Sequence, residues 1–557
     1  MTISGRLRLA AAATAAASIA LTGCTGTEGQ ATATTTDGRI SYLNYGDFGG
    51  GTQPKANYNP FLLGSVLGGY GYVFEPLMMT NTYTCDAEPW LATDYEWVDD
   101  STLRYTLREG VKWNDGEDLT AEDVAFTFNM LRDHAALDTT GAWAYLDSVT
   151  AEGNTVTMKF QGAGAPAFTL VNDVRIVPEH VWSKVEDPTT FANAEDPVGT
   201  GPFTIGSLSS KQLVIERNAD YWQADKVKVD EIRFNKADGG GQVDQLKLSR
   251  GEYDHNAMFV PDIEKSYVAR DPEHNHYWYP PGGTISVYMN LTEAPFDDTA
   301  FRTALLTAFD KQEVAEKAQL GYVEQASQTG LVIPGQEDWV PEGVEDDGVM
   351  PYDVDAADRA LTEAGYETDA QGRRLGKDGK PISFSFKVPG EWTDWVAAAE
   401  ILVEDLRELG FDVNLERPTP ESYDADRASG SYDMLFGVHG GSCNIYRNFN
   451  EPLGSANTAP VGEPAASNFV RWQDPETDAA LDELRRATTE DQQKEAVADI
   501  AEIMVDEAPV IPVWYGAKWF QYSTQKAVGW PNAEDPYAGP ADNLLIITNL
   551  RPANEED

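Results

Sequence analysis

Positive charge is scarce in this sequence. The 557 residues include 41 lysines and arginines against 91 aspartates and glutamates, which gives a formal net charge of −50. Nucleic acids and anionic membrane surfaces bind proteins through clustered lysine and arginine, so the composition argues against both partners. A negatively charged ligand would need a locally basic site. The excess of acid is typical of an exported protein that its surface charge keeps in solution.

Long apolar runs and catalytic signatures are also missing. No stretch of the mature chain reaches the ~18 to 20 apolar residues that a membrane-spanning helix needs. The sequence has no Gly-x-Ser-x-Gly elbow, no His-Glu-x-x-His motif and no Walker loop. We therefore expect a protein that is not an enzyme, and we expect no cofactor.

Histidine is rare, with six residues in the chain. His274 and His276 form a His-x-His pair with Asp271 and Glu273 nearby, which is one arrangement that could hold a metal ion. An acidic loop in contact with water explains the same residues, and this interpretation predicts no metal site.

Cysteine is the third scarce residue type, with three in the chain. Arg6 and Arg8 precede an apolar, alanine-rich run over residues 9–20, and the segment ends in Leu-Thr-Gly-Cys24. A basic start, a short apolar run and small residues predict a secretory signal over residues 1–23. The ending resembles the bacterial lipobox, in which Cys24 is lipidated. The alternative is a plain secretory signal with an incidental cysteine.

A lipidated cysteine would hold the protein at the extracellular face of the cytoplasmic membrane without crossing it. Residues 24–38 are rich in threonine, glycine and alanine and predict a flexible tether. Cys85 and Cys443 then remain. An oxidising exterior favours one disulfide between them, and two free thiols are the alternative.

A strand followed by a helix is predicted between residues 89 and 131. Leucine and tyrosine alternate with arginine and threonine over residues 103–107, the period of a strand with one buried face. Thr120 lies three residues before Asp123, a short form of the capping box that begins a helix. The apolar residues that follow recur on one face of that helix.

Several sequence motifs follow one another in a fixed order along the chain. They are Phe74-Glu75-Pro76-Leu77, Leu107 to Gly116 with Leu119 to Val124, Gly199-Thr200-Gly201-Pro202-Phe203, Asn218-Ala219-Asp220-Tyr221-Trp222 and Glu363-Ala364-Gly365-Tyr366. Together they resemble the family 5 extracellular solute-binding proteins, the large receptors of ABC importers for oligopeptides and related solutes. The order covers almost the whole mature chain.

The resemblance implies an α/β, two-lobed, periplasmic-binding-protein-like fold of a large, type II-like form with an extra auxiliary subdomain. The expected ranges are 39–59, 197–291 and 508–557 for lobe I, 60–196 for the auxiliary subdomain, and 292–507 for lobe II. Lobes built from separate segments are joined by more than one crossing, which permits hinge closure over a ligand.

The resemblance also implies a function. We expect a monomeric, lipid-anchored receptor that closes on an oligopeptide and delivers it to an ABC permease and its ATPase. An oligosaccharide is the second ligand class, and nickel is a third because the family includes nickel-binding members. An extracellular hydrolase and a sensory receptor without a transport role are the alternatives from other classes.

Eight residues are predicted to contact the ligand: Tyr45, Asn59, Trp392, Trp395, His439, Asn444, Trp514 and Tyr515. Trp392 and Trp395 lie between a strand end and a helix start, the usual ligand side of an α/β lobe. Trp395 also fits the apolar stripe of that helix. Asn59 precedes a proline and equally fits a turn, and Trp514 and Tyr515 equally fit a core strand.

The loop over residues 439–444 departs from the peptide-binding members of the family. In those members a corresponding Gly-Trp-x-Ala-Asp-Tyr pattern carries an aspartate that can pair with the amino terminus of the peptide. Here Asn444 or Ile445 falls near the expected acid, and an amide lacks the full charge that strengthens such a pair. The departure leaves room for a neutral ligand such as an oligosaccharide.

Overall fold

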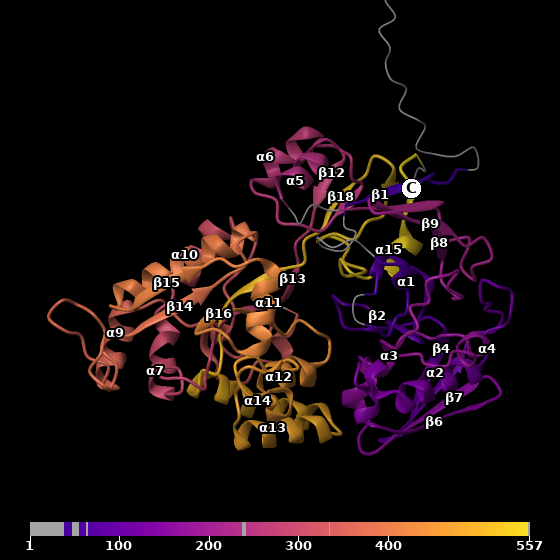
Figure 1. The fold of residues 1–557 in the computed structure, drawn as a ribbon. Helices are drawn as coiled ribbons and strands as arrows, with labels where there is room; N and C mark the ends of the chain where they lie inside the picture. Colours follow the sequence, from indigo (N-terminus) through magenta and orange to yellow (C-terminus); the bar gives the residue numbers. More distant parts are fainter. Residues whose placement is uncertain (1–37, 47–54, 63–64, 237–240, 334, 555–557) are drawn as a thin grey trace, which may run out of the picture.

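The structure is a computed structural model that describes residues 38–46, 55–62, 65–236, 241–333 and 335–554. The predicted secretory signal, Cys24 and almost all of the predicted tether lie outside these residues. Within them, three larger sheets form two lobes and an auxiliary subdomain (Figure 1). None of the helices described is long and apolar enough to cross a membrane.

Lobe I is built on a seven-stranded sheet with the order β12-β18-β11-β1-β10-β9-β8. Its strands are β1 (Leu43–Tyr45), β8 (Phe203–Leu208), β9 (Gln212–Arg217), β10 (Glu231–Asn235), β11 (His255–Asn256), β12 (Asn275–Tyr277) and β18 (Gln521–Ser523). The first strand, β1, lies between β10 and β11 and is parallel to both. The helices are α1 (Leu67–Val73), α5 (Gln242–Ser249), α6 (Ile263–Ser266) and α15 (Asn543–Asn549), and β19 (Ala527–Val528) pairs with β20 (Arg551–Pro552).

The auxiliary subdomain contains a four-stranded antiparallel sheet with the order β4-β5-β7-β6. Its elements are β2 (Met78–Thr80), β3 (Ala87–Pro89), β4 (Ala92–Asp99), β5 (Thr102–Leu107), β6 (Leu146–Glu152), β7 (Thr155–Phe160), α2 (Ala121–Asp133), α3 (Phe168–Asn172) and α4 (Glu179–Trp182). The predicted strand and helix are confirmed as β5 and α2. Thr120 and Asp123 form a complete capping box, in which each side chain accepts a hydrogen bond from the backbone N–H of the other residue.

Glu75 connects two of the sequence motifs at the junction of the auxiliary subdomain and lobe I. Its buried carboxylate accepts hydrogen bonds from Trp90 Nε1 (2.6 Å), the Tyr221 hydroxyl (2.8 Å) and Trp222 Nε1 (3.2 Å). Burial raises the pKa of Glu75 to about 7, although these donors favour the ionised form. These two motifs therefore build a structural joint and lie in the shared core.

Lobe II is built on a five-stranded sheet with the order β15-β14-β16-β13-β17. Its strands are β13 (Pro281–Met289), β14 (Ser383–Lys387), β15 (Asp412–Glu416), β16 (Met434–His439) and β17 (Ile511–Ala517). Its helices are α7 (Thr299–Ala304), α8 (Lys311–Glu313), α9 (Val354–Glu363), α10 (Thr393–Glu408), α11 (Pro420–Ser429), α12 (Ile445–Leu453), α13 (Pro475–Arg486) and α14 (Glu490–Asp506). Strand β14 is parallel to β15 and β16, so the carboxyl ends of these three strands lie at one edge.

The crossings between the lobes differ from the expected boundaries. The ranges 197–291 and 508–557 assigned β13 and β17 to lobe I, but both strands pair within the sheet of lobe II. The apolar sequence of each segment predicts a buried strand, but it does not show which sheet the strand joins. Trp278 donates a backbone hydrogen bond to Phe520 (2.8 Å), so the two crossing segments run side by side.

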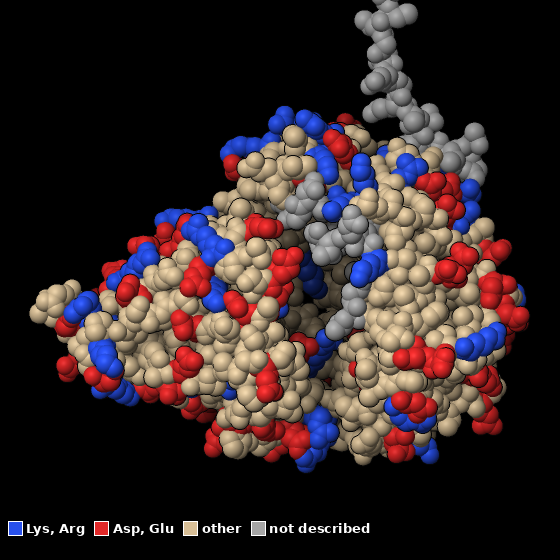
Figure 2. Space-filling model, viewed as in Figure 1, with Lys and Arg blue, Asp and Glu red and all other residues tan. Residues whose placement is uncertain are grey.

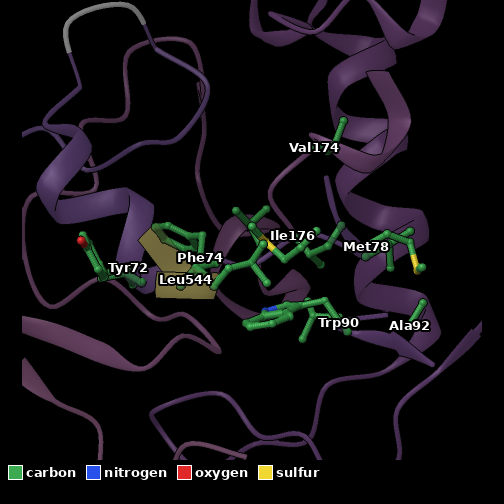
Figure 3. Close-up of a cluster of buried hydrophobic side chains, with 14 of the residues drawn as sticks. Tyr72, Phe74, Met78, Trp90, Ala92, Val174, Ile176 and Leu544 are labelled. Carbon is green, nitrogen blue, oxygen red and sulfur yellow. The ribbon is translucent and has the colours of Figure 1, made fainter. Parts of the chain in front are cut away.

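The hydrophobic residues form two large cores. One core spans lobe I and the auxiliary subdomain, and the other belongs to lobe II. In Figure 3, residues of α1, β2, the segment 174–176 and α15 come together in the shared core. The molecule therefore consists of two bodies with separate cores, joined by the crossing segments.

Candidate functional site

A cleft lies between lobe II and the body formed by lobe I and the auxiliary subdomain. Figure 2 shows a deep hollow between them, with lysine and arginine atoms inside it although the chain is strongly acidic. The loops after β14 and β16 leave the carboxyl edge of the lobe II sheet, which is the edge where open α/β sheets bind ligands.

Trp392 is the one predicted contact residue that remains substantially exposed. It precedes α10, its side chain is 38% exposed, and its ring centroid lies 4.7 Å from that of Trp395. Trp395 is buried and packs against Phe436 (5.7 Å) and Trp514 (6.4 Å) in the core of lobe II. Trp392 therefore offers an aromatic surface. Trp395 instead belongs to the buried apolar stripe of α10, which was the alternative interpretation of this residue.

His439 ends β16 in a buried position. Its Nδ1 lies 3.4 Å from both the Ser286 Oγ and the Tyr288 hydroxyl. Its Nε2 is buried and has no hydrogen-bond partner in the described part of the chain. Burial lowers the pKa of His439 to about 4, so the imidazole is neutral at pH 7.

The predicted pair in β17 is also internal. Trp514 packs against Phe436 (5.0 Å between ring centroids), and both belong to the core of lobe II. The Tyr515 hydroxyl accepts a hydrogen bond from Ser327 N (3.1 Å) and donates one to Leu331 O (3.1 Å). Both side chains are therefore buried parts of a core strand, which was the alternative interpretation of these residues.

The two predicted residues of the first segment are buried in the other body. Tyr45 packs against Phe234, with 5.4 Å between ring centroids. Asn59 donates hydrogen bonds to Pro188 O (3.2 Å) and Phe191 O (2.8 Å) and accepts one from the backbone of Phe61. Both side chains make their contacts within the protein, because tertiary packing decides which of the predicted polar and aromatic groups remain exposed.

Asn444 links lobe II to the auxiliary subdomain. Its Nδ2 donates to Pro166 O (2.7 Å) and to Thr169 Oγ1 (3.0 Å), next to and within α3. Its Oδ1 accepts a hydrogen bond from Arg447 N (2.9 Å) and caps α12. The side-chain amide therefore makes contacts within the protein on both of its polar atoms.

Cys85 and Cys443 form a disulfide in this structure, with 5.2 Å between their Cα atoms. Cys85 lies in the turn between β2 and β3, and Cys443 lies in the loop between β16 and α12. The bond therefore joins the auxiliary subdomain to lobe II.

A small pocket of about 120 Å³ contains charged groups that the sequence analysis did not select. Asp173, Arg175 and Asp542 line it together with apolar side chains that include Met78 and Leu544. Arg175 Nη1 is buried and has no hydrogen-bond partner among the described residues. A guanidinium nitrogen in such a position can donate to a bound anion.

The chain around this pocket alternates between the core and the pocket. Val174 and Ile176 are buried in the shared core, where Figure 3 labels both. Asp173 and Arg175 alternate with them and line the pocket. The sequence Asp-Val-Arg-Ile carries this period of two, which is the signal that could have found the pair.

Burial shifts the charges of the pocket. Desolvation raises the pKa of Asp173, and the positive charges of Arg175 and of Arg447 on α12 oppose the shift. Desolvation lowers the pKa of Arg175 and raises that of Asp542, whose Oδ2 accepts backbone hydrogen bonds from Thr82 (2.9 Å) and Gly539 (2.6 Å). A cation next to carboxylates can offer a partner to a charged ligand group of either sign.

Metal ligation finds no support in the described part of the chain. It contains no group of three or more histidine, cysteine, aspartate or glutamate residues that could hold a metal ion. His276 packs against Tyr522 in the sheet of lobe I, and His274 Nδ1 lies 3.2 Å from Thr524 Oγ1.

Comparison with known proteins adds an independent finding. The family model for bacterial extracellular solute-binding proteins, family 5, matches residues 86–459. Protein XP55 of Streptomyces lividans is 30% identical over 471 residues, which cover 79% of each chain. The nickel-binding periplasmic protein of Escherichia coli is 26% identical over 470 residues, which cover 80% of this chain and 83% of that protein.

A solved structure agrees with the fold. It is a mannohexaose-bound periplasmic oligopeptide-binding protein of an oligopeptide ABC transporter from Thermotoga maritima. The TM-score is 0.81 at 28% sequence identity, and the match covers 92% of this chain and 99% of the other. The expected two-lobed fold is confirmed.

Proposed function

Because this chain belongs to the family 5 bacterial extracellular solute-binding proteins, which bind solutes for transport and are not enzymes, we propose that its solute is an oligopeptide. The two bodies close on the peptide and present it to an ABC permease and its ATPase. Closure is favoured when the ligand makes contacts that exist only when both sides of the cleft are near.

The pair Asp173 and Arg175 carries this proposal. Each end of a peptide carries a charge, and the pocket offers a partner for either one. The Asp173 carboxylate suits an ammonium group, and the Arg175 guanidinium nitrogen, which has no hydrogen-bond partner among the described residues, suits a carboxylate. Asn444 replaces the aspartate expected on lobe II, and its amide is engaged within the protein. Asp173 supplies a carboxylate in the other body, near enough to lobe II for the charge of Arg447 on α12 to act on it.

The size of the pocket limits what it holds. At about 120 Å³ it accommodates one end group of a peptide, so the rest of the ligand would lie outside it. If only a charged end of the peptide is recognised by charge-assisted hydrogen bonds, the other side chains of the peptide can vary.

An oligosaccharide is the second candidate ligand. Trp392 keeps an exposed indole, and aromatic rings pack well against the apolar faces of sugars. The structural relative from Thermotoga maritima was solved with mannohexaose. An oligosaccharide has no charged ends, so Arg175 and Asp173 distinguish the two ligand classes.

Thermal unfolding against two ligand panels tests the proposal. One panel contains di- to octapeptides with free, amino-acetylated and carboxyl-amidated ends, and the other contains mannohexaose and related oligosaccharides. A ligand at 100 times its dissociation constant adds about 2.7 kcal/mol to the free energy of unfolding. We expect stabilisation by free peptides and its loss when an end is blocked. Stabilisation by oligosaccharides alone would overturn the proposal.

The attachment to the cell is a separate part of the proposal. The Leu-Thr-Gly-Cys24 ending supports lipidation of Cys24, which would hold a monomeric receptor at the extracellular face of the cytoplasmic membrane. Labelling of cells with a fatty acid should mark the wild-type protein and leave Cys24→Ala unlabelled. A labelled Cys24→Ala protein would contradict lipidation at this residue.

A further inference from the structure

The disulfide Cys85–Cys443 joins two bodies that do not share a core. Cys85 belongs to the body formed by lobe I and the auxiliary subdomain, and Cys443 belongs to lobe II. The two cysteines are 358 positions apart in the sequence. Neither core includes them, so each body has its own packing without the bond.

The bond lies next to the crossing segments. Lys518, in the second crossing, donates from its Nζ to Thr82 O (3.0 Å) in the turn that carries Cys85. Gly441, in the loop that carries Cys443, approaches the first crossing so closely that a Cβ on it would lie 2.0 Å from Gly282 O. The turn, the loop and both crossings therefore meet in one region.

A second interlobe contact follows directly after Cys443. Asn444 donates to Pro166 O and Thr169 Oγ1 of the auxiliary subdomain. One residue spans at most about 3.6 Å of chain, so Asn444 cannot move far from the subdomain while Cys443 is bonded to Cys85. The Tyr446 ring, 6.2 Å from that of Tyr145, extends this contact along α12.

We propose that the disulfide acts as a third covalent connection between the two bodies and restricts how far the cleft opens. With the bond intact, the start of α12 stays against α3, so lobe II cannot swing away from the auxiliary subdomain at this point. Without it, the crossing segments are the remaining covalent links, the contacts of Asn444 and Tyr446 can separate, and the ligand-free protein opens further. Cys85 and Cys443 are thus positioning residues for capture, whichever ligand the cleft takes.

Small-angle X-ray scattering of the ligand-free protein tests this inference. The mature chain, with Cys24 replaced by serine, is compared with the same chain carrying Cys85→Ser and Cys443→Ser. We expect a larger radius of gyration and a broader pair-distance distribution without the bond. Hydrogen exchange should become faster at residues 445–449 and stay unchanged in α14, which lies within lobe II.

Two further measurements keep the result interpretable. Reduction and alkylation of the bonded protein should reproduce the shape of the double variant, whereas the reductant should leave the double variant unchanged. Superimposable scattering curves with native circular dichroism would overturn the inference. Loss of the native circular dichroism signal in both the double variant and the reduced, alkylated protein would also overturn the inference, because it requires each body to fold without the disulfide. No ligand is present, so the outcome is separate from that of the peptide panel.

Discussion

At Arg175 one guanidinium nitrogen is buried and has no hydrogen-bond partner within the residues that the structure describes. A buried donor without a partner costs about 1–3 kcal/mol of stability. Proteins commonly hold such groups where a ligand supplies the missing bond, and stability then opposes function. Arg175 therefore makes opposite contributions to folding and to the proposed capture of a carboxylate.

Replacing Arg175 with methionine tests both contributions. We expect Arg175→Met to remove the cost of the unpartnered donor, about 1–3 kcal/mol, while the loss of its positive charge raises the pKa of Asp173 further. The free energy of unfolding should therefore rise most at a pH at which Asp173 is protonated. Affinity for a stabilising peptide should fall at least about tenfold, in line with a lost charge-assisted hydrogen bond. Urea unfolding and calorimetric titration measure the two effects.

The matched control is Arg132→Met on the outer face of α2, where the arginine is exposed and pairs with Asp133. This change should shift stability by less than about 0.5 kcal/mol and leave affinity unaltered. Equal effects of the two substitutions would contradict a ligand role for Arg175.

Glu75 predicts a dependence of stability on pH. Its pKa is raised from 4.5 to about 7 in the folded protein, so the folded state holds the proton more tightly than the unfolded state. The resulting stabilisation is fully present below pH 4.5 and is lost as the pH rises through 7. The change amounts to about 3 kcal/mol at most.

Glu75→Gln cannot titrate, so its free energy of unfolding should decline less steeply than that of the wild type between pH 5 and 7. Urea unfolding at pH 5, 6, 7 and 8 gives the two slopes. The comparison uses the slope because the glutamine also changes the hydrogen bonds to Trp90, Tyr221 and Trp222. Parallel slopes would show that the Glu75 carboxylate is not the titrating group.

Sequence could select residue types at the site but not their exposure. Trp392 and Trp395 lie three residues apart near the same helix start, yet one is exposed and the other is core. The alternation in Asp-Val-Arg-Ile could place Arg175 opposite the core, but the missing hydrogen bond of its guanidinium group is visible only in three dimensions. Asp173 is likewise identified by its three-dimensional neighbours, because it lines the same pocket as Arg175.

At the scale of elements, the start of α12 has two functions in one residue. Asn444 caps the helix through its Oδ1 and holds α3 through its Nδ2. Asn444→Ala removes both, whereas Asn444→Asp keeps an oxygen for the cap and places a carboxylate against the Pro166 carbonyl. The pair of variants therefore separates capping from the interlobe contact.

We expect Asn444→Ala to lower the free energy of unfolding by about 2 kcal/mol, half of it from the lost cap. Asn444→Asp should preserve the cap and yet destabilise by a similar amount, because two acceptors then face each other. Thermal unfolding measures both. Wild-type stability in Asn444→Asp would mean that the contact with α3 contributes nothing.

Individual helices and strands could be predicted from the sequence more fully than the exposure of residues or the assignment of strands to lobes. Local signals determined β5 and α2, since alternation and a capping box depend on neighbouring residues only. The assignment of β13 and β17 to a lobe depended on partners more than 100 residues away, which no local pattern contains. The resemblance to a family supplied the two-lobed arrangement, and the exact crossings came only from the pairing.

For the molecule as a whole, the net charge of −50 predicts a response to salt. Repulsion among the excess carboxylates weakens the compact state, while exposed ion pairs contribute about 0–1 kcal/mol each. Salt screens both, because the Debye length falls from about 30 Å at 0.01 M to about 3 Å at 1 M. The sign of the response shows which effect is larger.

We expect the melting temperature to rise between 0.01 M and 1 M sodium chloride, because the acids outnumber the basic residues more than twofold. Calorimetry at a series of concentrations measures the shift. The same series in sodium sulfate at equal ionic strength separates screening from the exclusion of salt from the protein surface. A falling melting temperature would mean that the ion pairs dominate.

The central position of β1 has a consequence for the order in which the protein is completed. Leu43 to Tyr45 are made early, but β1 pairs with β10 and β11, and β11 in turn pairs with β18 at residues 521–523. Lobe II likewise lacks β17 until residue 517 has been added. Neither sheet is complete until the last tenth of the chain has been added, so the final strand pairing of both lobes waits for the end of synthesis.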